Sequence, residues 1–232
     1  SIQQAEKLRI AKAVVSFLPE NGTVILDAGT TTAQIVPLIP DTSHLRIITN
    51  SPDHAVALME KENIEILLAG GRVRKATRSC VDQWAVDTFS GIVADVAVIA
   101  TNGISLARGL TTPEPAEAAV KTAMIGAAKR KIVVADHTKF TQDHFAKFGD
   151  IKDIDLVANT GNLLVPYQGT SATVASGTSA TTAFVYAPAS GANLNTDKFG
   201  LQITGVAKTY KTGLFKYEKT RRFVQNSRPG FR

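Results

Sequence analysis

The stretch TVILDAGTTTAQIV, residues 23–36, places an acid, a glycine and three threonines directly after a short apolar run. Val24, Ile25 and Leu26 have the β-branched and aliphatic side chains typical of a buried strand. Gly29 can take backbone angles closed to other residues, and a threonine hydroxyl can cap a helix that starts at this turn. The first N–H groups of such a helix carry partial positive charge, so the turn predicts a site for an anion such as phosphate. A plain, well-capped strand-to-helix turn would have the same sequence.

Further apolar runs are also followed by small, polar or charged residues. In an open α/β sheet a ligand binds outside the carboxyl ends of the strands, so the residues at these positions are expected to meet around one site. The residues with positive charge to offset a phosphate are Arg72, Arg74 and Lys139, and those able to bind hydroxyl groups are Asp27, Asn50, Asn102 and Asp136. Gly70 and Gly71 belong to the same set of strand ends. Together they predict a phosphorylated, polyhydroxylated small molecule as the ligand.

Other kinds of chemistry find little support in the sequence. His44, His54, His137 and His144 show no metal-ligand spacing, and the first two are expected at the surface. The single cysteine, Cys80, excludes an intrachain disulfide framework and a cysteine-based metal site. No apolar run approaches the ~20 residues of a membrane helix, no signal peptide is visible, and no nucleotide-binding motif is present. We therefore expect a cytoplasmic protein with no metal, no cofactor and no membrane contact.

The elements that would position this site alternate along the chain. Six apolar runs predict strands buried on both faces, at residues 24–28, 46–50, 64–70, 93–101, 131–136 and 154–159. Residues 5–18 predict an amphipathic helix with Leu8, Ala11, Val15 and Leu18 on one face. Helix starts are expected at Ser51-Pro52-Asp53 and at Thr112-Pro113-Glu114, the second helix running to a basic end at residues 129–130.

Strands that alternate with helices favour an open, mostly parallel α/β sheet flanked by helices. Pro37 lies about two turns beyond the threonines, so the helix that follows the first strand is expected to be short or kinked there.

The composition changes after about residue 160. Residues 1–160 hold 17 basic and 18 acidic side chains, residues 161–196 hold none, and residues 197–232 hold nine basic side chains against Asp197 and Glu218. The net charge of +6 therefore belongs to the end of the chain. We expect a domain over residues 1–160 and a Ser/Thr/Ala-rich, basic extension over residues 161–232, able to form β-hairpins around Lys211-Thr212-Gly213. The extension could contact nucleic acid or could simply be solvated.

The motifs LDAGTTT, ITNS, LLAGGRVR, GLTTPEPAEAAVKTAMIGAAKRKIVVADHTKF and DIDLV, in this order, resemble the effector-binding domain of DeoR-type bacterial transcription regulators over roughly residues 5–160. The resemblance implies a fold like that of ribose-5-phosphate isomerase or CoA-transferases, a phosphorylated sugar or related metabolite as effector, and a homo-oligomer. The implied ligand-binding residues are Asp27, Gly29, Thr30, Thr31, Thr32, Asn50, Gly70, Gly71, Asn102, Thr111, Lys121 and Lys139, to which strand-end chemistry adds Arg72 and Asp136.

The chain departs from that family in three places. We expect the winged helix-turn-helix, through which family members contact operator DNA, to be absent from this chain. Asp82 stands where a glycine is usual, and residues after about 160 match nothing in the family. An aldose–ketose isomerase on the same fold is the alternative. By the resemblance, its catalytic glutamate falls at Lys121 and its acidic loop at Thr101 and Asn102, while Glu114 and Glu117 lie nearby. Because an ammonium and neutral side chains do not readily remove a carbon-bound proton, we expect a sensor domain and not an enzyme.

Overall fold

The computed structural model of the chain describes residues 2–159 and, beyond them, the backbone of six short strands at 162–167, 183–187, 206–207, 221–222, 226–227 and 230–231. The hairpin turn expected at Lys211–Gly213 lies outside the described residues.

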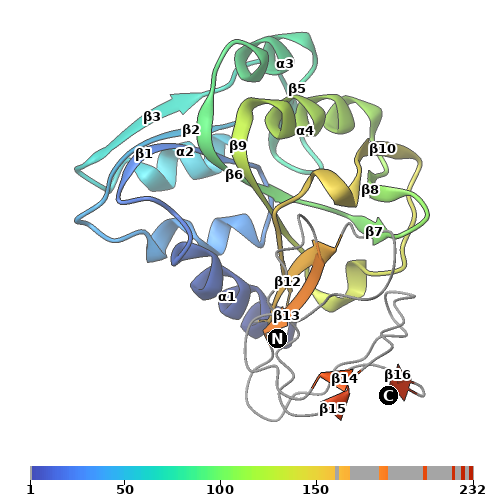
Figure 1. Ribbon diagram of the computed structural model, residues 1–232. Coiled ribbons are helices and arrows are strands. Elements are labelled where there is room, and N and C mark those ends of the chain that lie inside the picture. Colours follow the sequence, from blue (N-terminus) through green and yellow to red (C-terminus); the bar gives the residue numbers. More distant parts are fainter. Residues whose placement is uncertain are drawn as a thin grey trace.

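An eight-stranded sheet forms the centre of the molecule (Figure 1). Its members are β1 (Asn21–Leu26), β2 (His44–Thr49), β3 (Ile64–Leu68), β6 (Ala94–Ala100), β9 (Ala128–Val134), β11 (Leu156–Asn159), β12 (Asn162–Tyr167) and β13 (Ala183–Ala187). The order is β13-β12-β11-β9-β6-β1-β2-β3. The six strands β3, β2, β1, β6, β9 and β11 run parallel, and β12 and β13 are antiparallel additions at one edge. The strands β12 and β13, which follow residue 160, thus extend one edge of this sheet.

The order of the strands reverses between β1 and β6. From β1 the chain adds β2 and β3 on one side, and then returns to add β6, β9 and β11 on the other. Such a reversal opens a crevice outside the carboxyl ends of the two central strands, which is where open α/β sheets bind their ligands. All six predicted strands are present and parallel, so the fold class expected from the sequence is confirmed.

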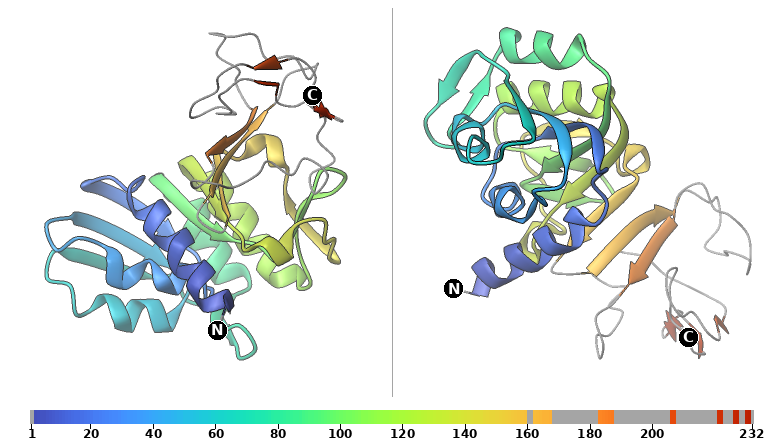
Figure 2. Two further views of the ribbon diagram at one scale, coloured as in Figure 1. Left: turned by 90° about the horizontal axis from the view of Figure 1, so that it is seen from below. Right: turned by 90° about the vertical axis from the view of Figure 1, so that its left-hand side faces the viewer.

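Helices cover both faces of the sheet (Figures 1 and 2). The helices are α1 (Ile2–Val15), α2 (Pro52–Leu58), α3 (Gln83–Ser90) and α4 (Pro115–Ala127). Side chains alternate along each strand, so that Val24 and Leu26 of β1 pack with α1 and α2, whereas Ile25 between them packs with α3 and α4. This alternation gives two separate buried layers, and it explains why the strands read as continuous apolar runs.

The segment after β1 differs from our prediction of a helix capped by threonine. It forms two single 3₁₀ turns, η1 (Thr32–Gln34) and η2 (Val36–Leu38), and no side chain caps the first of them. Pro37 lacks the N–H that an α-helix would need at this position, and its ring would clash with the carbonyl of Ala33. The prediction of a helix N-terminus for the anion was therefore wrong, although the expected interruption at Pro37 is confirmed.

Two helix predictions also need correction. Helix α4 ends at Ala127, and Lys129 and Arg130 belong to β9 instead of closing the helix. In α1 the fully buried residues are Ile10, Ala11 and Val14, whereas Leu8 is 36% exposed. The fully buried residues of the helix form an i, i+1, i+4 stripe. Of the predicted face, Ala11 belongs to this stripe, Val15 and Leu18 are partly buried against the same core, and Leu8 is the residue placed wrongly.

The remaining strands form small antiparallel pairs and one three-stranded sheet. A hairpin joins β4 (Arg72–Arg74) to β5 (Ser79–Val81), and β7 (Gly103–Ser105), β8 (Gly109–Thr112) and β10 (Ala146–Gly149) pack beside α4. Late in the chain, β14 (Val206–Ala207) pairs with β15 (Arg221–Arg222), and β16 (Asn226–Ser227) pairs with β17 (Gly230–Phe231). Within the described residues, no helix has both the length and the apolar character needed to cross a membrane.

Candidate functional site

A pocket of about 410 Å³ lies at the carboxyl ends of β1, β6 and β9. Its walls come from the turn after β1, the start of α2, the β4–β5 hairpin, the residues after β6, one face of α4, and the Asp136–Lys139 segment. Helix α1 contributes one residue, Lys7. The pocket therefore occupies the place where the strand order reverses, as the alternation of strands and helices predicts.

The centre of the site is a buried ion pair between Asp27 and Lys121. Asp27 follows β1, and its carboxylate accepts hydrogen bonds from the Lys121 ammonium and from the backbone N–H of Ala100, the latter at 2.9 Å. Lys121 also donates to the Ala100 carbonyl at 2.9 Å. Asp27 and Lys121 thus tie the end of β1, the end of β6 and helix α4 together beneath the pocket.

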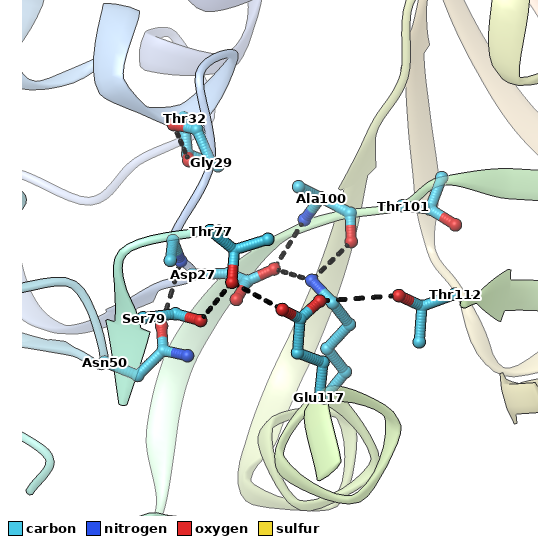
Figure 3. Close-up of polar contacts among 12 residues, drawn as sticks. Asp27, Gly29, Thr32, Asn50, Thr77, Ser79, Ala100, Thr101, Thr112 and Glu117 are labelled. Atoms are coloured by element: carbon cyan, nitrogen blue, oxygen red, sulfur yellow. Dashed lines mark hydrogen bonds and ion pairs between the residues drawn. The ribbon is translucent and has the colours of Figure 1, made fainter. Parts of the chain in front are cut away.

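Glu117 lies one turn before Lys121 on α4 and points toward the β4–β5 hairpin (Figure 3). Its carboxylate accepts hydrogen bonds from Thr77 at 2.5 Å and from Arg74 at 3.1 Å. Thr77 is also within 2.9 Å of Ser79. These contacts hold the tip of the hairpin over the pocket, so the hairpin is part of its wall.

Charged side chains of both signs line the pocket. The cationic ones are Lys7, Arg78, Lys121 and Lys139, and the anionic ones are Asp53, Glu117 and Asp136. Arg78 pairs with Asp53 at 2.9 Å through two largely exposed side chains, and the Lys139 ammonium is 3.9 Å from the Asp136 carboxylate. The exposed Arg78–Asp53 pair is weak and exchanges partners readily, so Arg78 is available to an anionic ligand. The Lys139 side chain is about one third exposed and its contact with the buried Asp136 is long, so its ammonium can also reach such a ligand.

His54, which we expected at the surface, is 3% exposed and lines the pocket. It lies in the first turn of α2, where its backbone N–H donates to the Ser51 hydroxyl at 3.2 Å, and its Nδ1 has no hydrogen-bond partner within the described residues. Burial lowers the pKa of His54, while Asp27, the Gly29 backbone and Asp53 act in the opposite direction. The ring is therefore held neutral beside the Gly29 turn.

Asp136 is 3% exposed and begins the segment that carries Lys139. Burial raises its pKa, but the net shift is downward because Thr138 donates through its hydroxyl and its backbone N–H, with further help from Lys139 and Lys7. The site thus keeps an ionised carboxylate next to two lysines.

One group of side chains in the described part of the chain has the spacing of metal ligands: Glu6, Asp136 and His137, with one ligand atom from each within 4.8 Å of the others. His137 Nδ1 is 3.0 Å from the Glu6 carboxylate, and Lys139 lies beside Asp136. The carboxylates are already matched by cationic or hydrogen-bonding neighbours, so we assign no metal here.

Residues 2–159 match the family described as the DeoR C-terminal sensor domain. The chain belongs to this family. Curated relatives include the HTH-type transcriptional regulator GlpR of Haloferax volcanii, 34% identical over 68% of this chain and 61% of the relative. The glycerol-3-phosphate regulon repressor of Escherichia coli is 32% identical over 67% of this chain and 62% of the relative. The chain therefore spans about three fifths of the length of these relatives.

The relatives of this DeoR sensor domain are named as transcriptional regulators and repressors, which agrees with the expectation of a non-enzyme. Among solved structures, ribose 5-phosphate isomerase A from Neisseria gonorrhoeae has a TM-score of 0.42 and 17% identity, over 59% of this chain and 53% of that one. A likeness this distant carries no argument about activity.

Half of the predicted ligand-binding residues line the pocket of this DeoR sensor domain. They are Gly29, Thr30, Thr31, Asn102, Lys121, Asp136 and Lys139. The other predicted residues, which are not in its wall, are Asp27, Thr32, Asn50, Gly70, Gly71, Arg72 and Thr111.

Most of those outside the wall have other partners. Asn50 is 3% exposed and links the turn after β1 to β5, accepting from the Ala28 N–H at 2.9 Å and donating to the Cys80 carbonyl at 3.3 Å. The fully buried Thr111 accepts from the His144 N–H at 3.0 Å. Arg72 forms an exposed ion pair with Asp82 at 2.7 Å. These side chains shape the loops around the pocket without facing it.

Sequence reasoning missed several residues of the wall, notably Lys7, Ser51, His54, Thr77 and Arg78. Ser51 and His54 follow the predicted strand end at Asn50 directly, so an extension by one helical turn would have included them. Thr77 and Arg78 lie at the tip of a hairpin whose reach over the sheet has no signature in the local sequence.

Proposed function

We propose that residues 2–159 bind a phosphorylated sugar or a related phosphorylated metabolite in this pocket, and that binding controls the contact of the full-length repressor with DNA. The observation that carries the proposal is the position of the pocket at the reversal of strand order, with four cationic side chains in its wall. A relative at 32% identity is named as the repressor of a glycerol-3-phosphate regulon.

The lining divides into groups suited to the two parts of such a ligand. Lys139 and Arg78, with the hydroxyl groups of Thr30 and Thr31, would hold a phosphate, because charge-assisted hydrogen bonds to its oxygens are roughly twice as strong as neutral ones. Glu117 and Asn102 would accept hydrogen bonds from hydroxyl groups of the ligand. Lys121 is ion-paired with Asp27 at the floor of the pocket, so it would contribute positive charge to the site without bonding the phosphate directly.

Regulation would follow from differential affinity. A ligand shifts an equilibrium between two arrangements only as far as it binds one of them more tightly. In a full-length DeoR-type repressor, a winged helix-turn-helix would contact operator DNA, and a homo-oligomer would place two such heads at fixed spacing. Effector binding in residues 2–159 would then favour one spacing of the heads and change the affinity for the operator. Such a repressor would act in the cytoplasm.

Proton abstraction by this site has weak support. Lys121, at which the resemblance to isomerases places their catalytic glutamate, is ion-paired with Asp27 and bonded to the Ala100 carbonyl. Glu117 accepts from Thr77 and Arg74. An ammonium engaged in this way does not readily remove a proton from carbon, and the Glu117 carboxylate is held toward the β4–β5 hairpin, so we propose binding without turnover.

The experiment is a thermal-shift screen of this chain against glycerol 3-phosphate, glucose 6-phosphate, fructose 1-phosphate and ribose 5-phosphate, each with its unphosphorylated parent. A ligand at a hundred times its Kd stabilises the folded state by about 2.7 kcal/mol, which raises Tm by roughly 5–10 °C. We expect a shift with at least one phosphorylated compound, none with its parent, and no conversion of the compound by NMR. Equal shifts with the parents, or turnover of the compound, would refute the proposal.

A further inference from the structure

Helix α1 changes character along its length. Its second half is held in the core by Ile10, Ala11 and Val14, all fully buried. One turn earlier on the same stripe lie Glu6 and Lys7, at positions i−4 from Ile10 and Ala11. The face that is apolar over the sheet thus becomes charged at the pocket, where Lys7 forms part of the wall.

Two polar contacts connect this first half of α1 to the loops around the pocket. The Glu6 carboxylate, 10% exposed, is 3.0 Å from Nδ1 of His137, and His137 lies between the pocket residues Asp136 and Lys139. On the other side, Gln4 donates to Gln34 of η1 at 3.5 Å. Glu6 therefore fixes the rotation of the helix, and the next residue along the chain faces the pocket.

Lys7 has no hydrogen bond or ion pair to any residue between 2 and 159, although its charge helps to lower the pKa of Asp136. A half-buried lysine beside an ionised carboxylate and near Lys139 is placed to bind a dianion that enters the pocket. An anion bound between the two lysines would contact α1 and the Asp136–Lys139 segment at once, and would join them more firmly than Glu6 and His137 do alone.

We infer that Lys7 is a ligand-binding residue, and that helix α1 thereby registers whether the pocket is occupied. The inference rests on the proposed function, since it needs an anionic ligand in the pocket. It adds to that function a specific element that responds, the first two turns of α1.

The test pairs Lys7→Met with Lys12→Met. Lys12 is an exposed lysine on the same helix and is not part of the pocket, so both variants lose one charge from α1. Affinity is measured by calorimetry with the phosphorylated compound that gives the largest shift in the panel, and with inorganic phosphate. Hydrogen exchange is followed at the backbone amides of residues 6–9, with and without the compound.

We expect Lys7→Met to weaken binding about tenfold, as for loss of one charge-assisted hydrogen bond, and Lys12→Met to leave it unchanged. Exchange at residues 6–9 should slow on binding in the wild type and in Lys12→Met, and should slow much less in Lys7→Met. Unchanged affinity in Lys7→Met with the same exchange response would overturn this inference and leave the proposed function standing. Absence of binding by every phosphorylated compound to the wild type would overturn both.

Discussion

Asp27 and Lys121 form a buried ion pair although 94 residues separate them in the sequence. Their side chains are 2% and 7% exposed, and the only partners that the described residues offer the Lys121 ammonium are the Asp27 carboxylate, the Ala100 carbonyl and the face of Phe148. The pair fastens α4 to the ends of the two central strands, and with them the floor of the pocket.

Removal of one member of this pair should destabilise the fold strongly. We expect Lys121→Met or Asp27→Asn to lower the free energy of unfolding by about 3 kcal/mol or more, because each leaves an uncompensated buried charge or an unsatisfied polar group. The double variant Asp27→Asn/Lys121→Met should be less destabilised than the sum of the two single variants. Urea unfolding measures all three, and strict additivity would contradict a direct pairing.

Lys139 and Arg72 should differ in their effect on ligand binding, although the sequence predicts both as ligand-binding residues. Lys139 lines the pocket, so Lys139→Ala should weaken binding of a phosphorylated ligand about tenfold without unfolding the chain. Arg72→Ala removes only the exposed pair with Asp82, and binding should stay within experimental error. Calorimetric titration measures the affinity of both variants. A larger loss of affinity in Arg72→Ala than in Lys139→Ala would mean that the ligand binds outside this pocket.

Stability should fall in mild acid because of His54. Its pKa is lowered from the ordinary 6.5 by burial, so the folded chain holds the neutral ring while the unfolded chain takes up a proton below that pH. The contribution is complete above about pH 6.5 and is lost as the pH falls toward the folded-state pKa, with a slope that approaches about 1.4 kcal/mol per pH unit.

The charged groups near the His54 ring also affect its pKa. Asp27 and Asp53 oppose the shift, and both are themselves paired, with Lys121 and Arg78. We expect His54→Gln to flatten the dependence of the free energy of unfolding on pH between 7.5 and 5, measured by urea melts. The exposed His44, changed to Gln, is the control. Equal slopes in wild type and His54→Gln would show that folding does not lower the pKa of His54.

Gly71 and Gly70 offer a matched pair in the turn between β3 and β4. Gly71 has φ +123°, and a Cβ there would lie 2.4 Å from the Val81 carbonyl oxygen, whereas nothing lies within 4 Å of a Cβ at Gly70. Gly71→Ala should therefore destabilise the chain by about 2 kcal/mol or more, and Gly70→Ala by less than about 1 kcal/mol. Thermal and urea unfolding give both values, and a reversed order would mean that the turn adopts another conformation.

Much of the fold could be predicted from the sequence because strands buried on both faces are continuous apolar runs. The reversal of strand order at β1 could not be predicted, because it depends on pairings between strands that are distant in the sequence. Thr31 and Lys139 could be found because they stand just after predicted strands. Arg78 and Lys7 could not, since a hairpin tip and a helix from the start of the chain reach the pocket only through tertiary packing.

Asn50 and Thr111 remain predicted ligand contacts, but they do not line the pocket. A buried amide or hydroxyl at a strand end can equally bond backbone groups of a neighbouring loop, as both do here. The turn after β1 was predicted to start an α-helix because the threonines suit a cap. The segment forms 3₁₀ turns instead, because Pro37 lacks the N–H that would continue an α-helix.

The long sequence separation between Asp27 and Lys121 also bears on the kinetics of folding. The pocket needs β1, α4 and the Asp136–Lys139 segment together, so it cannot exist in any folding intermediate that lacks the pairing of β1 with β6. Such non-local contacts carry a large loop-closure entropy and form slowly. The appearance of ligand affinity during refolding would therefore report the pairing of the two central strands. A nascent chain could bind a ligand in this pocket only after at least residue 139 had left the ribosome.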